Sequence, residues 1–142
     1  MSETVAHLHP TATVEPGEGH LARARLRLRL VLGAGHKLGP GKIDLLEAVA
    51  STGSITAAGR RMGMSYRRAW LLIDEANRIF TEPLVTTASG GAGGGGAHLT
   101  DLGFEVVAAF RRIEARTRAA IADEFATLEP RFADLDAPLP ER

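Results

Sequence analysis

The sequence predicts a mainly α-helical fold with a small β wing and a long C-terminal helix. Three observations predict it. Apolar residues recur at helical spacing in three short segments between residues 41 and 80. A glycine-rich run at 89–97 then separates two short extended segments, and a last helical pattern continues over 101–128.

Length and composition bound the kind of protein. A chain of 142 residues fits one compact domain with appendages. Hydrophobic residues make up 44% and aromatic residues only 5%, so the core is expected to be aliphatic. The absence of cysteine excludes disulfides and thiolate chemistry. No apolar run reaches the roughly 20 residues that cross a bilayer, and the start of the chain does not read as a secretory signal. We therefore expect a cytoplasmic protein without a membrane partner.

The formal net charge of zero conceals a strong asymmetry. Residues 20–68 carry ten basic and two acidic side chains, whereas residues 1–19 carry three acidic and no basic ones. Residues 69–142 carry seven basic and twelve acidic side chains. Because attraction to phosphates follows local rather than total charge, the middle segment is a candidate for contact with nucleic acid.

The first third of the chain contains two contrasting segments. Residues 1–20 lack periodicity and are predicted to form a disordered arm, in which His7 and His9 are expected to be solvated rather than to bind a metal. Residues 21–32 alternate arginine with leucine or alanine. A period of two predicts a β-strand with one buried and one basic face.

Three helices are predicted next. The first covers 41–52 and ends at a glycine. Ser54 is a suitable N-cap for a short helix over 55–62, and Ser65 for a third helix over 66–80. The apolar stripe of this third helix consists of Ala69, Leu72, Ile73, Ala76, Ile79 and Phe80.

The remaining residues predict a wing and a long helix. Residues 83–87 and 97–100 form the two strands of the wing, and the helix runs from 101 to 128. At 1.5 Å per residue this helix would be about 42 Å long, more than so small a core covers, so its far half is expected to pair with a second copy. The expected dimer contacts are Val106, Phe110, Ile113, Ile121 and Phe125. The predicted domains are a disordered arm (1–20), a DNA-binding domain (21–99), a dimerisation helix (100–128) and a flexible tail (129–142).

The helices predicted over 55–62 and 66–80 are separated by a turn of about three residues. The second begins with serine, tyrosine and arginine. This is the pattern of a helix-turn-helix. Arg67 and Arg68 are candidates for base recognition, because a guanidinium can bind guanine with two hydrogen bonds. The alternative is that the serines only cap helices and the arginines are solvated. The full set of candidate DNA contacts is Ser54, Thr56, Arg61, Ser65, Tyr66, Arg67, Arg68, Gly93, Gly94, Gly95 and His98.

A resemblance to a known family adds to this reading. The string GSITAAGRRMGMSYRRAWLLIDEAN (53–77), followed by GGAGGGGAHLT (90–100), is similar to the N-terminal domain of ModE-type molybdate-responsive regulators. The resemblance extends from about Leu26 to Ala126. It implies a winged helix-turn-helix that dimerises through its long helices and controls genes of molybdate uptake or molybdoenzyme production. It places the start of the recognition helix at 65–70 and the wing at 90–97.

The chain departs from that family in two respects. Members that sense molybdate have further C-terminal domains that bind the oxyanion, whereas only residues 129–142 follow the last predicted helix. No molybdate site of the familiar kind, and no cofactor, is therefore expected. Ala92 also stands in the wing where a basic residue would be expected, so the wing is predicted to contact DNA through backbone amides and His98.

The sequence also allows three alternative interpretations. Residues 91–96 satisfy G-x-G-x-x-G, the fingerprint of a dinucleotide-binding enzyme. That fingerprint requires a helix that opens directly at the glycines inside a parallel βαβ unit, which this sequence does not predict. A nucleotide-binding enzyme is therefore disfavoured, and no catalysis is expected. Trp70 and Phe104 are interpreted as packing residues rather than stacking platforms. A winged helix used for protein contact, for instance with a separate ligand-sensing regulator, is the main competitor. Its binding would depend less steeply on salt.

Overall fold

The computed structural model describes residues 18–88 and 96–141, which form two compact units. The larger unit is Arg27–Ala115, and the other combines residues 18–26 with 116–141. Among the described residues, no helix has both the length and the apolar character needed to cross a bilayer.

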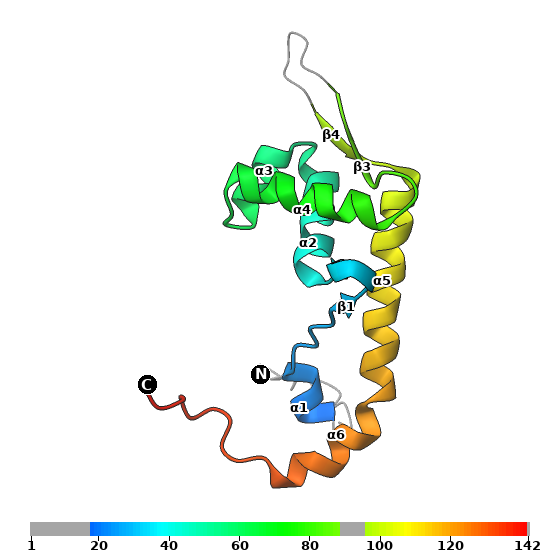
Figure 1. Ribbon diagram of the computed structural model, residues 1–142. Helices are drawn as coiled ribbons and strands as arrows, with labels where there is room; N and C mark the ends of the chain where they lie inside the picture. Colours follow the sequence, from blue (N-terminus) through cyan, green and yellow to red (C-terminus); the bar gives the residue numbers. More distant parts are fainter. Residues whose placement is uncertain (1–17, 89–95, 142) are drawn as a thin grey trace, which may run out of the picture. The chain divides into compact units, whose positions relative to one another are not determined.

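The larger unit is built on three packed helices, α2 (Pro40–Thr52), α3 (Ile55–Arg61) and α4 (Tyr66–Ile79) (Figure 1). The predicted boundaries agree with these to within one residue. Each helix turns an apolar stripe inward, and the core is aliphatic as the composition indicated. Its largest fully enclosed side chains are Phe110, Ile43, Leu45, Leu46, Leu84 and Val49.

The wing consists of β3 (Val85–Thr87) and β4 (Ala97–Leu99), which pair antiparallel with Val85 opposite Leu99. The side chain of Asn77 fixes the base of the wing to the end of α4. Its Oδ1 accepts hydrogen bonds from the amides of Leu84 (2.8 Å) and Val85 (3.1 Å). The wing is thus anchored to the helices, which sets its position relative to α4.

The helix α5 (Asp101–Ala120) begins directly after the wing. Thr100 caps it, because its Oγ1 accepts from the amide of Gly103 at 3.0 Å while its hydroxyl donates to the carbonyl of Pro83 at 2.8 Å. Gly103 is required here, since a β-carbon at this position would collide with the carbonyl oxygen of Leu84.

One arginine ties α5 to α2. Arg111 donates twice to Glu47 (2.9 and 3.0 Å), once to Asp44 (2.7 Å) and once to Glu114 (2.8 Å). The hydrogen bond to Glu47 contributes most to raising the pKa of Arg111 above its ordinary value, and partial burial opposes it. The guanidinium is therefore a permanently charged link between the two helices.

The prediction of one strand over residues 21–32 is wrong. The chain there begins with the end of α1 (Glu18–Arg23), and only β1 (Leu30–Val31) pairs with β2 (Lys37–Leu38). The predicted alternation does occur, since residues 24–30 are alternately half-buried and exposed. Extended backbone becomes a strand only where a neighbour completes the hydrogen bonds, and among the described residues only β2 supplies one.

The predicted long C-terminal helix is present, but it is interrupted rather than continuous over 101–128. The helix ends at Ala120, Ile121 has φ −90° and ψ 0°, and α6 (Ala122–Leu128) follows. A short 3-10 turn, η2 (Glu129–Arg131), then begins the segment predicted to be a tail. Within this smaller unit α6 packs on α1 and η2, and the rings of Phe125 and Phe132 meet edge to face at 5.5 Å. After the break, α6 places half-buried residues against these elements.

Candidate nucleic-acid interface

The two helices α3 and α4 form a helix-turn-helix whose ends are defined by side-chain caps. Ser54 Oγ accepts a hydrogen bond from the amide of Ala57, and Ser65 Oγ accepts one from the amide of Arg68, both at 3.1 Å. Between them, Gly63 has φ +69°, a left-handed conformation that glycine adopts without strain. Both predicted caps are confirmed, and their oxygens are engaged in shaping the turn.

Helical geometry divides the surface of α4 into distinct sides. Successive residues are about 100° apart around the axis, and the buried side chains Ala69, Ile73 and Ala76 mark the inner side. The opposite side, called here the outward face, consists of Arg67, Leu71, Asp74 and Arg78. On this face Leu71 is 46% exposed, and Arg78 pairs with Asp74 at 2.8 Å. Arg67 therefore lies in the centre of the surface that α4 presents outward.

Between α4 and the wing lies a hollow of about 230 Å³. Tyr66 and Trp70 line it from α4, and the two residues are 56% and 49% exposed. Three hydroxyl-bearing residues also line it, namely Ser54 and Thr56 at the start of α3 and Thr87 of the wing. Aromatic surface bordered by hydroxyl groups suits a nucleotide, because hydroxyls bind phosphate oxygens and rings contact sugars or bases.

Neither Trp70 nor Phe104, which were expected to serve as packing residues, belongs to the core, and about half of each is exposed. The helical stripe of α4 predicts which residues face inward, and position 70 lies outside that stripe. An aromatic residue outside the apolar stripe and one turn after Tyr66 was the signal that could have identified Trp70.

The two arginines in the first turn of α4 lie on different sides of the helix. Arg67 belongs to the outward face, whereas Arg68 lines a separate hollow on the far side of α4 from the wing. Arg61, at the end of α3, is exposed and donates a hydrogen bond to Ser51 Oγ. The structure thus brings Ser54, Thr56 and Tyr66 together and separates them from Arg61 and Arg68.

The candidate contacts on the wing are only partly described. Gly93, Gly94 and Gly95 lie outside the described residues. His98 lies on β4 opposite Thr86, with an exposed side chain. Within 18–88 and 96–141, no three histidine or acidic side chains gather in a way that could hold a metal ion.

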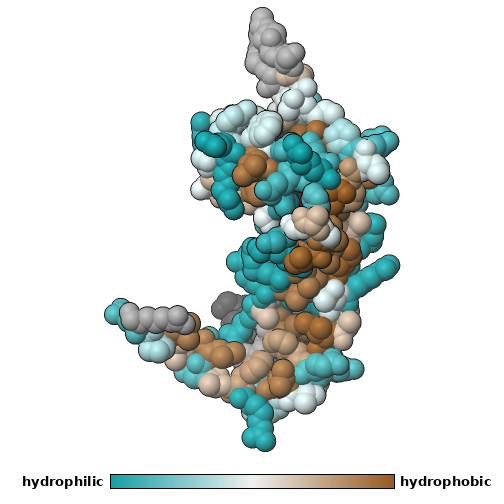
Figure 2. All heavy atoms as spheres, in the orientation of Figure 1, coloured by the Kyte–Doolittle hydropathy of each residue, from teal (hydrophilic) through white to brown (hydrophobic). Residues whose placement is uncertain are grey.

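The candidate dimer contacts fall into two groups. Val106 and Phe110 are enclosed by the core of their own chain, with Phe110 only 1% exposed. They are therefore not available to a second copy, which corrects that part of the prediction. Ile113 is exposed, whereas Ile121 and Phe125 are half-buried. In the face shown in Figure 2, hydrophobic residues gather over α5.

These features define the class of domain to which the larger unit belongs. The described helices and wing form a winged helix-turn-helix, and residues 41–104 match the family described as bacterial regulatory helix-turn-helix protein, lysR family. Over the part that holds this domain, the chain is similar to ModE-type regulators.

Three relatives illustrate the similarity. The chain is 44% identical over 81 residues to the molybdenum-pterin-binding protein MopB of Rhodobacter capsulatus, covering 57% of this chain and 30% of the relative. It is 40% identical over 95 residues to the molybdenum transport protein ModE of Azotobacter vinelandii, covering 67% and 35%. It is 43% identical over 68 residues to the DNA-binding transcriptional dual regulator ModE of Escherichia coli (strain K12), covering 48% and 26%. The match thus spans about a third or less of each relative.

Proposed function

We propose that this chain is a sequence-specific DNA-binding transcriptional regulator of genes for molybdate transport or molybdenum enzymes. The observation that carries the proposal is the exposed start of α4, where Arg67, Tyr66 and Trp70 stand beside an anchored wing. In a winged helix-turn-helix the start of the second helix enters the major groove. The similarity to proteins named ModE supports the connection with molybdenum.

Each side chain has a distinct role in this proposal. Arg67 reads a base edge, because it lies centrally on the outward face and a guanidinium pairs with guanine through two hydrogen bonds. Tyr66 and Thr56, together with the hollow they line, hold the adjoining backbone. Arg61 contributes charge at the edge of the helix-turn-helix. No cofactor is required for this step.

The regulator acts as a homodimer on an approximately palindromic operator in this proposal. A two-fold dimer presents two copies of α4 to half-sites that lie one or more helical turns apart. Of the predicted dimer contacts, Ile113 is exposed and Ile121 and Phe125 are half-buried, so these three are assigned to the subunit contact.

The test is to map the DNA that the purified protein retains from the genome of its source organism. We expect enrichment of a few upstream regions that share an inverted repeat, near genes of molybdenum metabolism. Retained fragments should then be titrated with protein at several salt concentrations. Binding that is absent at low salt, or that does not weaken steeply as salt rises, would contradict the proposal. A molybdate titration follows, to ask whether the signal is sensed by this chain or by a separate protein.

A module for protein contact is the alternative, and one observation favours it. Leu71 and Trp70 place exposed apolar surface on α4, and buried aromatic side chains anchor many protein interfaces. Such a module would partner a separate ligand-sensing regulator. Its binding would survive high salt, whereas DNA binding through the same face would weaken steeply. A thymine methyl group can accept Leu71 in the major groove, so salt dependence rather than the exposed leucine distinguishes the two functions.

A further inference from the structure

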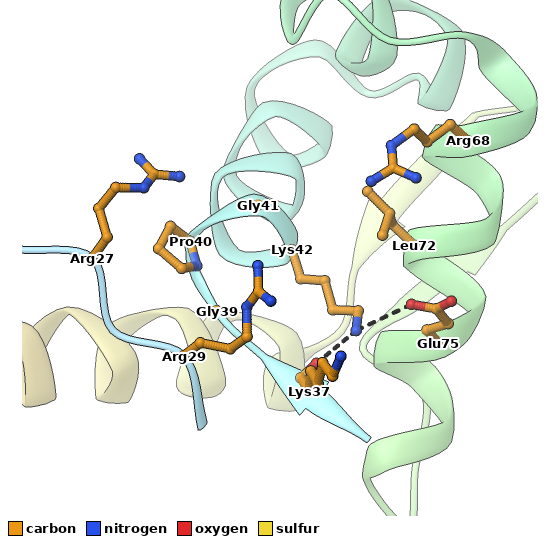
Figure 3. Close-up of a pocket in the computed structure, with 10 residues that line it drawn as sticks. All are labelled: Arg27, Arg29, Lys37, Gly39, Pro40, Gly41, Lys42, Arg68, Leu72 and Glu75. Carbon is orange, nitrogen blue, oxygen red and sulfur yellow. Dashed lines mark hydrogen bonds and ion pairs between the residues drawn. The ribbon is translucent and has the colours of Figure 1, made fainter. Parts of the chain in front are cut away.

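A second hollow, of about 550 Å³, lies on the side of α4 away from the wing and is called here the basic pocket. It is enclosed by the segment that precedes β1, by β2, by the start of α2 and by α4 (Figure 3). Its lining side chains include five cations and one carboxylate. The charged residues are Arg27, Arg29, Lys37, Lys42, Arg68 and Glu75.

The single carboxylate is already neutralised. Lys42 Nζ lies 3.1 Å from Glu75 Oε2 and donates to the carbonyl of Lys37 at 2.6 Å (Figure 3). The side chain of Lys42 is only 10% exposed, so this pair is held in place. Within the part of the chain that the structure describes, the other four cations form no ion pair. The pocket therefore concentrates positive charge that attracts an anion.

The start of α2 adds to this potential. Its N-cap is Gly39, no side chain caps the first turn, and that turn contains no acidic residue. The N-terminal end of a helix carries a partial positive charge. A β-carbon added at Gly41 would meet nothing within 4 Å, so the backbone there is open to a ligand.

We propose that the basic pocket is a phosphate-binding site, filled by a backbone phosphate of the DNA that the start of α4 engages. The inference rests on the proposed function. Measured across the outward face, Arg68 lies roughly 200° around α4 from Tyr66 and roughly 160° from Trp70. When that face enters a major groove, the wing side meets one strand's backbone and the basic pocket meets the other's. The guanidinium of Arg68 then pairs with phosphate rather than with a base.

A free phosphate-like oxyanion has the same chemistry as a backbone phosphate, so the test has two arms. In the first, duplex fragments retained in the genomic mapping are titrated with protein over a range of salt. In the second, inorganic phosphate is titrated without DNA while the amide resonance of Gly41 is followed by NMR.

Gly41→Asp is the principal variant, with Gly41→Asn as its uncharged, nearly isosteric control. The new carboxylate occupies open space in the first turn of α2, where a negative charge stabilises a helix, so the melting temperature should not fall. We expect DNA affinity to drop on the order of tenfold in the aspartate variant, the scale of one lost charge-assisted contact. The salt slope should fall by about one. The asparagine variant adds the same bulk without the charge, so it should lose clearly less affinity than the aspartate variant and should keep the salt slope of the parent.

Glu75→Gln tests the same site in the opposite direction. Removing the only carboxylate raises the net positive charge of the pocket, so DNA affinity should rise a few-fold at low salt. A variant that merely disturbed folding would weaken binding instead, and melting temperatures identify that outcome.

The outcomes separate the claims. A larger loss of DNA affinity in Gly41→Asp than in Gly41→Asn, with a lower salt slope only in the aspartate variant, supports the site and its backbone ligand. Saturable shifts with inorganic phosphate that vanish in Gly41→Asp, with unchanged DNA affinity, support the site with a free oxyanion as ligand. Unchanged DNA affinity together with no phosphate-dependent shift overturns the inference. Failure of the parent protein to bind any DNA refutes the proposed function alone, because the phosphate arm still tests the pocket.

Discussion

Replacing Arg67 by alanine, and comparing the result with Arg61→Ala, tests how the helix-turn-helix reads DNA. Arg67 lies at the centre of the outward face of α4, where a side chain reaches base edges when the helix enters a groove. Arg61 lies at the end of α3 and is partly engaged by Ser51. The proposed function therefore assigns base recognition to Arg67 and attraction to the backbone to Arg61.

The two variants should lose DNA affinity in different ways. Two hydrogen bonds from Arg67 to guanine would discriminate against the wrong base by about 1–3 kcal/mol, which corresponds to roughly 5- to 150-fold in affinity. Arg67→Ala should lose this on the operator but little on unrelated DNA. Loss of one phosphate contact at Arg61 should weaken both DNAs alike and reduce the salt slope by about 0.9.

The assay is fluorescence anisotropy with two labelled duplexes, an operator fragment and a shuffled sequence of equal composition, each at several salt concentrations. Melting temperatures of both variants provide the control for folding. Equal losses on both duplexes in both variants would refute the assignment of roles. So would a loss of specificity in Arg61→Ala alone.

Three further changes test other parts of the structure. Gly103→Ala should lower the free energy of unfolding by about 2 kcal/mol or more, because the added methyl group collides with the carbonyl of Leu84, whereas Gly41→Ala has open space and should be neutral or stabilising; urea titration compares the two. Arg111→Met should cost about 1–3 kcal/mol, since it leaves three carboxylates without their shared cation on a partly solvated surface, and calorimetry at low and high salt should show the loss shrinking as salt rises. Trp70→Ala should leave the melting temperature almost unchanged but weaken DNA binding several-fold, because half of the ring is exposed and lines the hollow beside the wing; a large drop in stability would instead restore its reading as a core residue.

Local signals in the sequence predicted the helix-turn-helix well. Ser54 and Ser65 accept hydrogen bonds from amides three residues further along, and glycines end the first two predicted helices. The helix boundaries are therefore determined by residues close together in the sequence. The alternation in residues 24–30 was likewise real. Whether it becomes a strand depends on a neighbour supplied elsewhere in the chain, which a single segment cannot reveal.

The parts that sequence reasoning missed depend on tertiary contacts. Arg27, Arg29 and Lys37 were recognised as basic but not as neighbours of Arg68, because the fold brings these distant segments together around the start of α2. Phe110 lies on the same helical stripe as Ile113, and only the packing of α5 against its own core distinguishes a buried residue from one available to a partner.

The central claim is that the outward face of α4 lies in the major groove, and site-directed DNA cleavage tests it most directly. The chain contains no cysteine, so Leu71→Cys gives a single attachment point for an iron chelate in the centre of that face. Ala108→Cys, exposed on α5, is the matched control. The account predicts strong cuts within each half-site from position 71 and weak or absent cuts from position 108. Cuts from position 108 with none from position 71 would contradict it.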